Sequence, residues 1–211
     1  MVSRGAGAGA LRGPIKKAGT LRIIGGKWRR SLLPVLDVPG LRPTPDRVRE
    51  TAFNWILHQR GGTLQGAAVL DPFCGSGALG VEAASRGAGP VVLGDANAQV
   101  IASLRATLAR LGDEAVTLVV SDALRLLATC AARGDRFGVI FLDPPFASDW
   151  IARILPKLLD VCGPAALVYV ESDYELTEAE SAASGFERLR KDKAGQVFYH
   201  LLRRNIDAPV L

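Results

Sequence analysis

The sequence has few cysteines and no long apolar run. Its 211 residues include three cysteines, Cys74, Cys130 and Cys162, which form no close pair and no Cys-X-X-Cys motif. Such spacing argues against a disulfide framework and a cysteine-ligated zinc site, and fits small buried residues in a reducing compartment. No apolar stretch approaches the roughly 18–20 residues that cross a bilayer. The N-terminus lacks the apolar segment of a secretory signal. We therefore expect a cytoplasmic protein with no membrane span and no metal site.

Acidic residues are missing from the first 36 positions. That stretch holds eight of the 26 Lys and Arg residues, which leaves 18 basic residues to face all 21 acidic residues in the rest of the chain. The formal net charge of +5 is thus an average over a basic arm and a mildly acidic body. A basic arm suggests a polyanionic partner, and Trp28 among the cations suits stacking on bases. The alternative is a solvated tail that only aids solubility.

Hydrophobic and polar residues are present in ordinary globular proportions. Hydrophobic residues make up 48% and charged residues 22% of the chain. These proportions exclude a disordered chain, a collagen-like fibre and a coiled coil. At this length we expect one domain, or one domain with a small appendage.

The apolar pattern alternates between strands and helices after an N-terminal hairpin. A strand at 21–24 and a turn at Gly25-Gly26 precede a possible partner at 27–33, and a helix through 48–56 follows Thr44-Pro45. Alternating strands and helices predict a parallel sheet covered on both faces. We expect strands at 67–70, 91–93, 116–120, 137–142 and 165–170, helices at 77–85, 99–111, 123–132 and 150–159, and an antiparallel hairpin of 186–191 with 196–202.

Each expected parallel strand is followed closely by an acidic residue. In parallel sheets the ligand lies outside the carboxyl ends of the strands. We therefore expect these five carboxylates to gather at one site: Asp71, Asp95, Asp122, Asp143 and Glu171.

The segment Gly75-Ser-Gly-Ala-Leu-Gly80 fits the pattern Gly-X-Gly-X-X-Gly between a strand and a helix. Asp95 follows the first glycine by 20 residues, as does an acid that binds ribose hydroxyls. The strand, however, ends in Asp71, which would repel a pyrophosphate and would accept hydrogen bonds from an ammonium. S-adenosylmethionine fits this series, with Asp71 at its amino-acid end, Asp95 at the ribose and Asp122 at the adenine amine.

The string Asp143-Pro-Pro-Phe146 ends another buried strand. It could be only a strand-ending turn, because proline stops strands. In a ligand cleft, the carboxylate and the Pro144 carbonyl could accept hydrogen bonds from a planar exocyclic amine, while Phe146 stacks on the base. Catalysis would then consist of orientation and electrostatic stabilisation of an in-line methyl transfer.

The chain resembles the bacterial 16S rRNA guanine-N2 methyltransferases that modify guanine 966. Asp-Pro-Pro-Phe after the fourth strand is a signature of N-methyltransferases that act on nucleobase amines. The resemblance covers about residues 20–204. It is carried by four segments, which are residues 21–29, 40–55, 70–83 and 169–172.

The resemblance implies a class I, Rossmann-like methyltransferase fold. This is an α/β fold with a mostly parallel seven-stranded sheet, a C-terminal antiparallel hairpin and a small N-terminal hairpin. It also implies S-adenosylmethionine as cofactor and 16S rRNA, in the small subunit or its assembly intermediate, as substrate of a monomer. Asp95 departs from relatives that often have Glu there. We expect a flexible basic extension at 1–19, an RNA-contacting hairpin and helix at 20–60, a methyltransferase domain at 61–205 and a tail at 206–211.

The expected site residues fall into three groups. The catalytic group, which holds the guanine amine, is Asp143, Pro144, Pro145 and Phe146. The cofactor group is Asp71, Phe73, Gly75, Gly77, Asp95, Ala96, Asp122, Ala123 and Asp143. The RNA-contacting group is Arg22, Lys27, Trp28, Arg29, Arg30, Arg42, Arg47 and Arg49, whose cations could neutralise phosphates or stack on bases.

Three other functions are weighed against this one. Methylation of adenine N6 or of cytosine in DNA or RNA would use the same tetrapeptide. A dinucleotide dehydrogenase is disfavoured by Asp71 and the tetrapeptide, and a noncatalytic RNA-binding factor would show no methyl transfer. His58 and His200 are expected in surface or packing roles. The roles of Trp150 and Glu171 stay open between structure and substrate.

Overall fold

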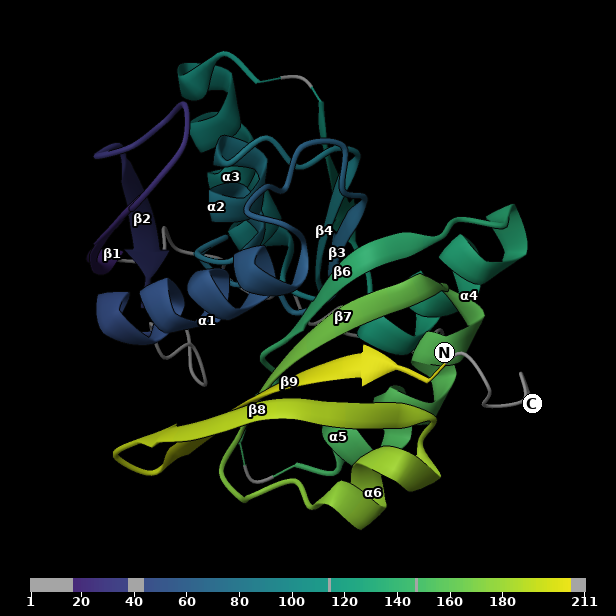
Figure 1. The fold of residues 1–211 in the computed structure, drawn as a ribbon. Coiled ribbons are helices and arrows are strands. Elements are labelled where there is room, and N and C mark those ends of the chain that lie inside the picture. The colour runs from purple at the N-terminus through teal and green to yellow at the C-terminus, as the bar shows by residue number, and fades with distance from the viewer. Residues whose placement is uncertain (1–16, 38–43, 114, 147, 206–211) are drawn as a thin grey trace, which may run out of the picture.

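The computed structural model describes residues 17–37, 44–113, 115–146 and 148–205. Its main sheet has seven strands in the order β5-β4-β3-β6-β7-β9-β8. All neighbours are parallel except those of β9, which runs antiparallel to both β7 and β8. The expected α/β fold with a C-terminal hairpin is therefore confirmed (Figure 1).

The elements of the main sheet and its helices have the following bounds. The strands are β3 Val69–Asp71, β4 Val91–Asp95, β5 Val116–Val120, β6 Phe137–Leu142, β7 Cys162–Ser172, β8 Phe186–Ala194 and β9 Val197–Arg204. The helices are α1 Asp46–Gln59, α2 Gly80–Ser85, α3 Ala98–Leu111, α4 Ala123–Arg133, α5 Trp150–Ile154 with the 3-10 turn η1 Leu155–Asp160, and α6 Glu178–Ala183.

Alternating side chains of the central strands bury both faces of the sheet. In β6, Val139 and Phe141 pack into the cluster formed with α1, α2 and α3. Ile140 and Leu142 point to the other side and pack with α4, α5 and η1. The period of two in a strand thus explains why the sheet lies between two helical layers (Figure 1).

The N-terminal hairpin forms a separate two-stranded sheet of β1 Lys17–Arg22 and β2 Leu32–Leu36. The expected pairing of 21–24 with 27–33 is confirmed in part, because Leu21 pairs with Leu33 and Arg22 with Leu32. The strands extend further from the turn than expected, and residues 25–30 form a turn held to α2. The Lys27 amide donates to the Ser85 carbonyl at 2.7 Å, and Glu82 accepts from the amides of Ile24 and Gly25. β1 also includes residues 17–19, which the sequence pattern assigns to the extension.

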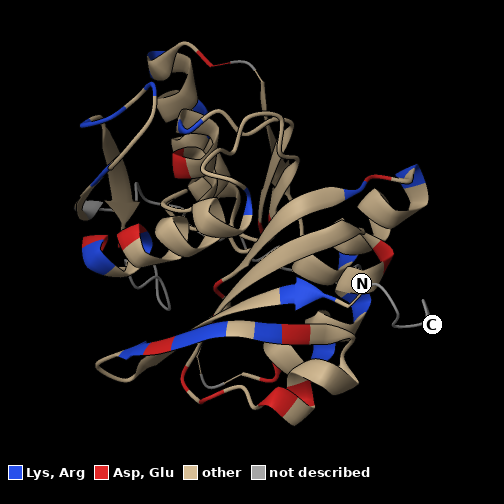
Figure 2. Ribbon diagram, in the orientation of Figure 1, with Lys and Arg blue, Asp and Glu red and all other residues tan. Residues whose placement is uncertain are grey.

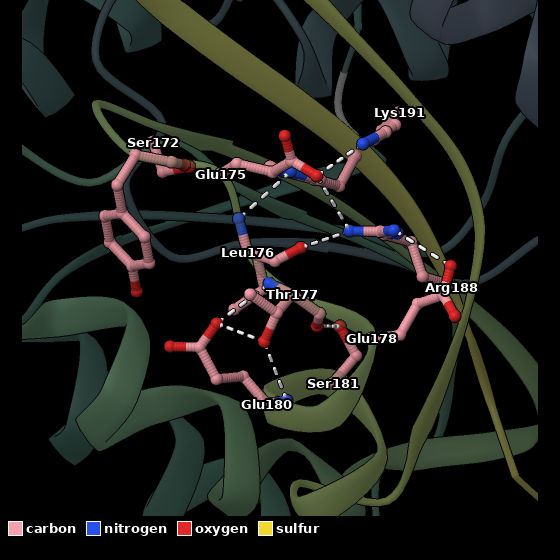
Figure 3. A network of polar contacts seen from close by, with 11 residues as sticks. Ser172, Glu175, Leu176, Thr177, Glu178, Glu180, Ser181, Arg188 and Lys191 are labelled. Atoms are coloured by element: carbon pink, nitrogen blue, oxygen red, sulfur yellow. Dashed lines mark hydrogen bonds and ion pairs between the residues drawn. The ribbon is translucent and has the colours of Figure 1, made fainter.

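Helix α6 is an element that the sequence analysis does not contain. Thr177 and Glu180 form a capping box at its start, which satisfies backbone donors that the helix leaves open. Arg188 of β8 pairs with Glu178 and with Glu175, so the segment after β7 is tied to the hairpin (Figure 3). None of the helices in the described ranges is long and apolar enough to cross a membrane.

Candidate active site

A cavity of about 870 Å³ lies outside the carboxyl ends of the parallel strands. This is where ligands bind in open α/β sheets. The start of α1 and the tip of the β8–β9 hairpin complete its wall, through Thr44, Val48, Ala194 and Val197. The structure brings the five strand-end acids together on this wall: Asp71, Asp95, Asp122, Asp143 and Glu171.

Asp71 is a buried acid with an open acceptor. Its Oδ2 accepts from the Gly80 amide at 3.2 Å, while Oδ1 has no hydrogen-bond partner among the described residues. Burial raises the pKa of Asp71 to about 7, against the opposing effect of the Gly80 amide. A buried carboxylate oxygen without a partner is costly, so its presence on the cavity wall points to a ligand that donates a hydrogen bond.

Asp95 organises the glycine-rich loop. Its two oxygens accept from the Gly75 amide at 3.1 Å and from the Asn97 amide at 2.7 Å. Burial raises its pKa, opposed by those same amides. Each oxygen retains a second lone pair that can accept from a ribose hydroxyl. Gly75 and Ala96 line the cavity beside it.

Gly77 differs from the other expected cofactor residues because it does not line the cavity. It has a φ of +79°, and a Cβ there would lie 2.6 Å from the Leu104 Cδ2. A direct contact of Gly77 with the cofactor stays a prediction. Gly77 shapes the loop, since only glycine adopts this backbone without strain and without a side-chain clash.

Asp122 and two aromatic rings form the side of the cavity near α4. Asp122 caps α4 by accepting from the amides of Leu124 and Arg125, and Ala123 follows it on the wall. Phe73 and Trp150 make an edge-to-face contact with centroids 5.2 Å apart. Trp150 borders the cavity and also packs against the core cluster of α4, α5 and η1, so it has both of the roles that the sequence left open.

Asp143, Pro144, Pro145 and Phe146 line the opposite part of the cavity. The Thr44 hydroxyl lies 3.5 Å from Asp143 Oδ2 and 3.4 Å from Glu171 Oε2. Burial raises the pKa of Asp143, and the nearby carboxylates of Glu171 and Asp71 raise it further. The structure thus places a second acid beside the tetrapeptide.

Thr44 is a site residue that sequence reasoning missed. Its position before Pro45 suggested only a helix start, but Pro45 is the N-cap of α1 and no side chain caps the helix. The Thr44 side chain, which is 6% exposed, turns instead toward the two acids. The only sequence signal was that Thr44 lies within a segment that carries the family resemblance.

The expected RNA-contacting residues are spread over different environments. Trp28 is 8% exposed and packs in the core, which corrects the expectation that its ring stacks on bases. Arg49 is fully buried and donates to Asp46 and to the Arg22 carbonyl, so its expected contact with RNA is corrected as well. Arg22, Lys27, Arg29, Arg30 and Arg47 are exposed, and Arg42 lies outside the described residues.

The turn at residues 25–30 lies far from the cavity. Helix α2 begins at Gly80, which contacts Asp71 on the cavity wall, and ends at Ser85, which binds the Lys27 amide. Lys27 also pairs with Asp113, past the end of α3. A helix of the length of α3 spans about 20 Å. Arg47, another exposed cation of the predicted group, lies in the first turn of α1, next to the cavity residue Val48.

The described residues contain no group of three or more His, Cys, Asp or Glu residues arranged to hold a metal ion. His200 is buried in β9, where its Nε2 accepts from the Leu176 amide. His58 is exposed on α1. Neither lines the cavity. Cys74, Cys130 and Cys162 are buried free thiols.

Comparison with known proteins gives consistent results. A family model described as Conserved hypothetical protein 95 matches residues 21–203. Ribosomal RNA small subunit methyltransferase D of Escherichia coli is 40% identical over 189 residues, which are 89% of this chain and 91% of that protein.

Solved structures agree with these sequence matches. An Escherichia coli structure described as a methyltransferase aligns with a TM-score of 0.74 and 41% identity, over 88% of this chain and 98% of the other. A structure from Streptococcus mutans, described as an S-adenosylmethionine-dependent methyltransferase, aligns with a TM-score of 0.65 and 16% identity, over 82% of this chain and 53% of the other. At that identity the second likeness concerns the fold alone.

Proposed function

The chain belongs to the family described as Conserved hypothetical protein 95 and is an S-adenosylmethionine-dependent methyltransferase, and we propose that its substrate is the exocyclic N2 amine of a guanine in 16S rRNA. The observation that carries the proposal is one cavity in which an acid with an open acceptor, Asp71, faces the same space as Asp143-Pro-Pro-Phe146. The 40% identity to the small-subunit enzyme supports the choice of RNA. The guanine 966 position rests on the family resemblance.

The residues present fit the cofactor. Asp71 Oδ1 is placed to accept from an ammonium, as the amino-acid end of S-adenosylmethionine requires. Asp95 can accept from the ribose hydroxyls, and Asp122 with Ala123 borders the place for the adenine. When bound, the cofactor supplies a methyl group activated by its sulfonium. Phe73 contributes an apolar wall.

The tetrapeptide orients the target amine. The Asp143 carboxylate and the Pro144 carbonyl would accept hydrogen bonds from its two N–H groups, so that its lone pair is directed at the methyl group, and the proton released on methylation would pass to Asp143. Pro145 restricts the backbone, and Phe146 offers a ring face on which the base stacks. Because the nucleophile is the amine itself, the contribution of these residues is orientation and charge stabilisation. A guanine must leave its helix or lie unpaired to enter such a cavity.

The RNA approaches, in this proposal, over the start of α1 and the hairpin tip, with Arg47 near a phosphate. Arg22, Lys27, Arg29 and Arg30 would contact a second, more distant RNA segment, and Arg42 belongs to the segment that leads into Thr44. Two contact regions at separate ends fit an extended substrate such as the small subunit or its assembly intermediate. We further propose that the enzyme acts in the cytoplasm as a monomer.

The test is to identify the methylated nucleoside. Small subunits that lack the modification are incubated with the enzyme and labelled S-adenosylmethionine, and the RNA is digested and analysed by mass spectrometry. We expect N2-methylguanosine at one position. Methylated adenosine or cytidine would favour the alternative amino-methyltransferase, and absence of any transfer by the wild type would favour a noncatalytic RNA-binding factor.

A further inference from the structure

Glu171 is an acid of the cavity wall that the methyl transfer described above does not use. It lies near the end of β7, and its side chain is held from two sides. The Tyr169 hydroxyl, two residues earlier on the same face of the strand, donates to Oε1 at 2.9 Å. The Thr44 hydroxyl lies 3.4 Å from Oε2. Glu171 is only 3% exposed, so its carboxylate has one orientation, beside Asp143 and toward the cavity.

Placing two carboxylates side by side in a buried site has an electrostatic cost. Burial raises the pKa of Glu171, although the hydroxyls of Tyr169 and Thr44 oppose the shift. The two carboxylates together offer four acceptor oxygens, and these two hydroxyls supply one donor each. When both carboxylates are charged, two further donors are therefore needed to complete the pair.

Guanine has two adjacent donors on its Watson–Crick edge. Its ring N1–H lies next to the N2 amine, whereas in adenine and cytosine the ring nitrogen beside the amine carries no hydrogen and accepts instead. A guanine whose N2 amine binds Asp143 thus presents N1–H to the neighbouring acceptor. An adenine or cytosine held by its amine would direct a lone pair at a carboxylate, which is unfavourable in a buried site.

We propose that Glu171 is a specificity-determining residue, whose carboxylate accepts the N1–H of guanine while Asp143 accepts the N2 amine. The inference rests on the proposed function. Tyr169 and Thr44 are positioning residues that hold the Glu171 carboxylate at the required angle. The pair of acids, and not the tetrapeptide alone, then separates guanine from the other amine-bearing bases.

The experiment uses a substrate base in which N1 carries no hydrogen. The O6 oxygen is lost with it, so the evidence is the change in the ratio of the two rates between enzyme variants. Small subunits are reconstituted with RNA carrying either guanine or 2-aminopurine at the target position, since 2-aminopurine keeps the N2 amine but has an unprotonated N1. Methyl transfer is measured as kcat/KM on both substrates for the wild type, for Glu171→Gln and for Glu178→Gln. Glu178 is an exposed residue of α6 and provides the matched control. Affinity for S-adenosylhomocysteine checks that each variant keeps its cofactor site.

The wild type and Glu178→Gln should prefer guanine by about tenfold or more, because a site built to accept a hydrogen bond rejects the analogue that lacks the donor. In Glu171→Gln the amide can donate to an unprotonated N1, so the preference should fall at least tenfold or reverse, with affinity for S-adenosylhomocysteine retained. An unchanged ratio in Glu171→Gln would overturn the inference, even if both rates fall.

Two further outcomes keep the inference separate from the proposed function. If Glu171→Gln does not fold, the test is the ratio of the wild-type rates on the two bases. Equal rates would overturn the role of Glu171 and would leave guanine methylation intact. If the wild type transfers no methyl group to the guanine substrate, the proposed function itself fails, and the inference with it.

Discussion

At the scale of a single residue, the burial of Asp71 raises the pKa of its carboxyl, and this should make cofactor binding depend on pH. Its pKa of about 7, raised mainly by burial, means that part of the population is protonated at neutral pH. Binding an ammonium requires the charged form. Affinity for S-adenosylhomocysteine should therefore rise with pH between about 6 and 8, and binding near pH 7 should release protons.

Calorimetry in buffers with different ionisation enthalpies measures this proton release. Asp71→Asn should bind about ten- to hundredfold more weakly, because a hydrogen bond to a charged group is lost, and its affinity should no longer vary with pH. Asp160→Asn, at an exposed position of η1, should behave as the wild type. Wild-type affinity that is flat across this range would show that Asp71 does not bind the ammonium.

His200 is the residue whose burial should make stability depend on pH. Burial lowers its pKa from 6.5 to about 4, assisted by Arg188. A group with a depressed folded pKa disfavours the proton in the native state, so its contribution is complete above pH 6.5 and is lost as pH falls toward 4. The loss amounts to about 3 kcal/mol at most.

The free energy of unfolding, measured by urea denaturation from pH 7.5 to 4.5, tests this contribution. His200→Gln keeps an acceptor for the Leu176 amide but does not titrate, so its curve should fall less steeply than that of the wild type. Parallel curves for the two proteins would assign the acid sensitivity to other groups.

At the scale of the element, α1 carries two arginines with different tasks. Arg49 is buried among Asp46, the Arg22 carbonyl and, at 4.0 Å, Glu82, and so links α1 to α2 and to the N-terminal hairpin. Arg47 is exposed and lies near Asp192, close to the tip of the β8–β9 hairpin. The pKa of Asp192 is lowered mainly by the Tyr199 hydroxyl and to a smaller extent by the charge of Arg47.

We expect Arg49→Met to destabilise the protein by about 2 kcal/mol, since the hydrogen bonds of the buried guanidinium to the Arg22 carbonyl and to Asp46 are lost. Arg47→Met should leave the melting temperature within a few degrees of the wild type and weaken binding to the small subunit. Thermal denaturation and filter binding separate the two effects. Equal losses of stability in both variants would contradict the division of roles.

The bounds of a strand or helix could be predicted from the sequence where the local pattern of apolar residues is enough to determine them. The strands at 116–120 and 137–142 have the bounds expected from their apolar runs, and the acid after each parallel strand falls in the cavity because parallel strands end at one edge. Trp28 and Arg49 were not predictable as buried, because their environment is set by Ser85, Glu82 and other partners distant in sequence. Helix α6 was missed because it is short and depends on a capping box and on Arg188.

At the scale of the whole molecule, the basic residues within the described ranges do not form one surface. The turn at residues 25–30 lies past the ends of α2 and α3, whereas the cavity lies at their beginnings. Several Lys and Arg residues also lie along β8, together with the acids Glu187 and Asp192 (Figure 2). An RNA that contacts both ends, as we propose, must therefore be extended.

This arrangement predicts different effects of charge reversal at the two ends. Arg29→Glu with Arg30→Glu should weaken binding to the small subunit and reduce its salt dependence, with kcat at saturating substrate unchanged because these residues lie far from the cavity. Titrations at several salt concentrations measure the first effect and steady-state kinetics the second. Unchanged affinity would show that this turn is only a solvated surface.

Asp71, Asp95, Asp143 and Glu171 line one cavity, and we propose that the first two hold the cofactor and the last two the base. The most direct measurement is single-turnover methyl transfer to small subunits by Asp143→Ala, combined with its affinity for S-adenosylhomocysteine. We expect transfer to fall by at least about a hundredfold while the affinity stays within a few-fold of the wild type. Transfer at the wild-type rate by this variant would contradict the account.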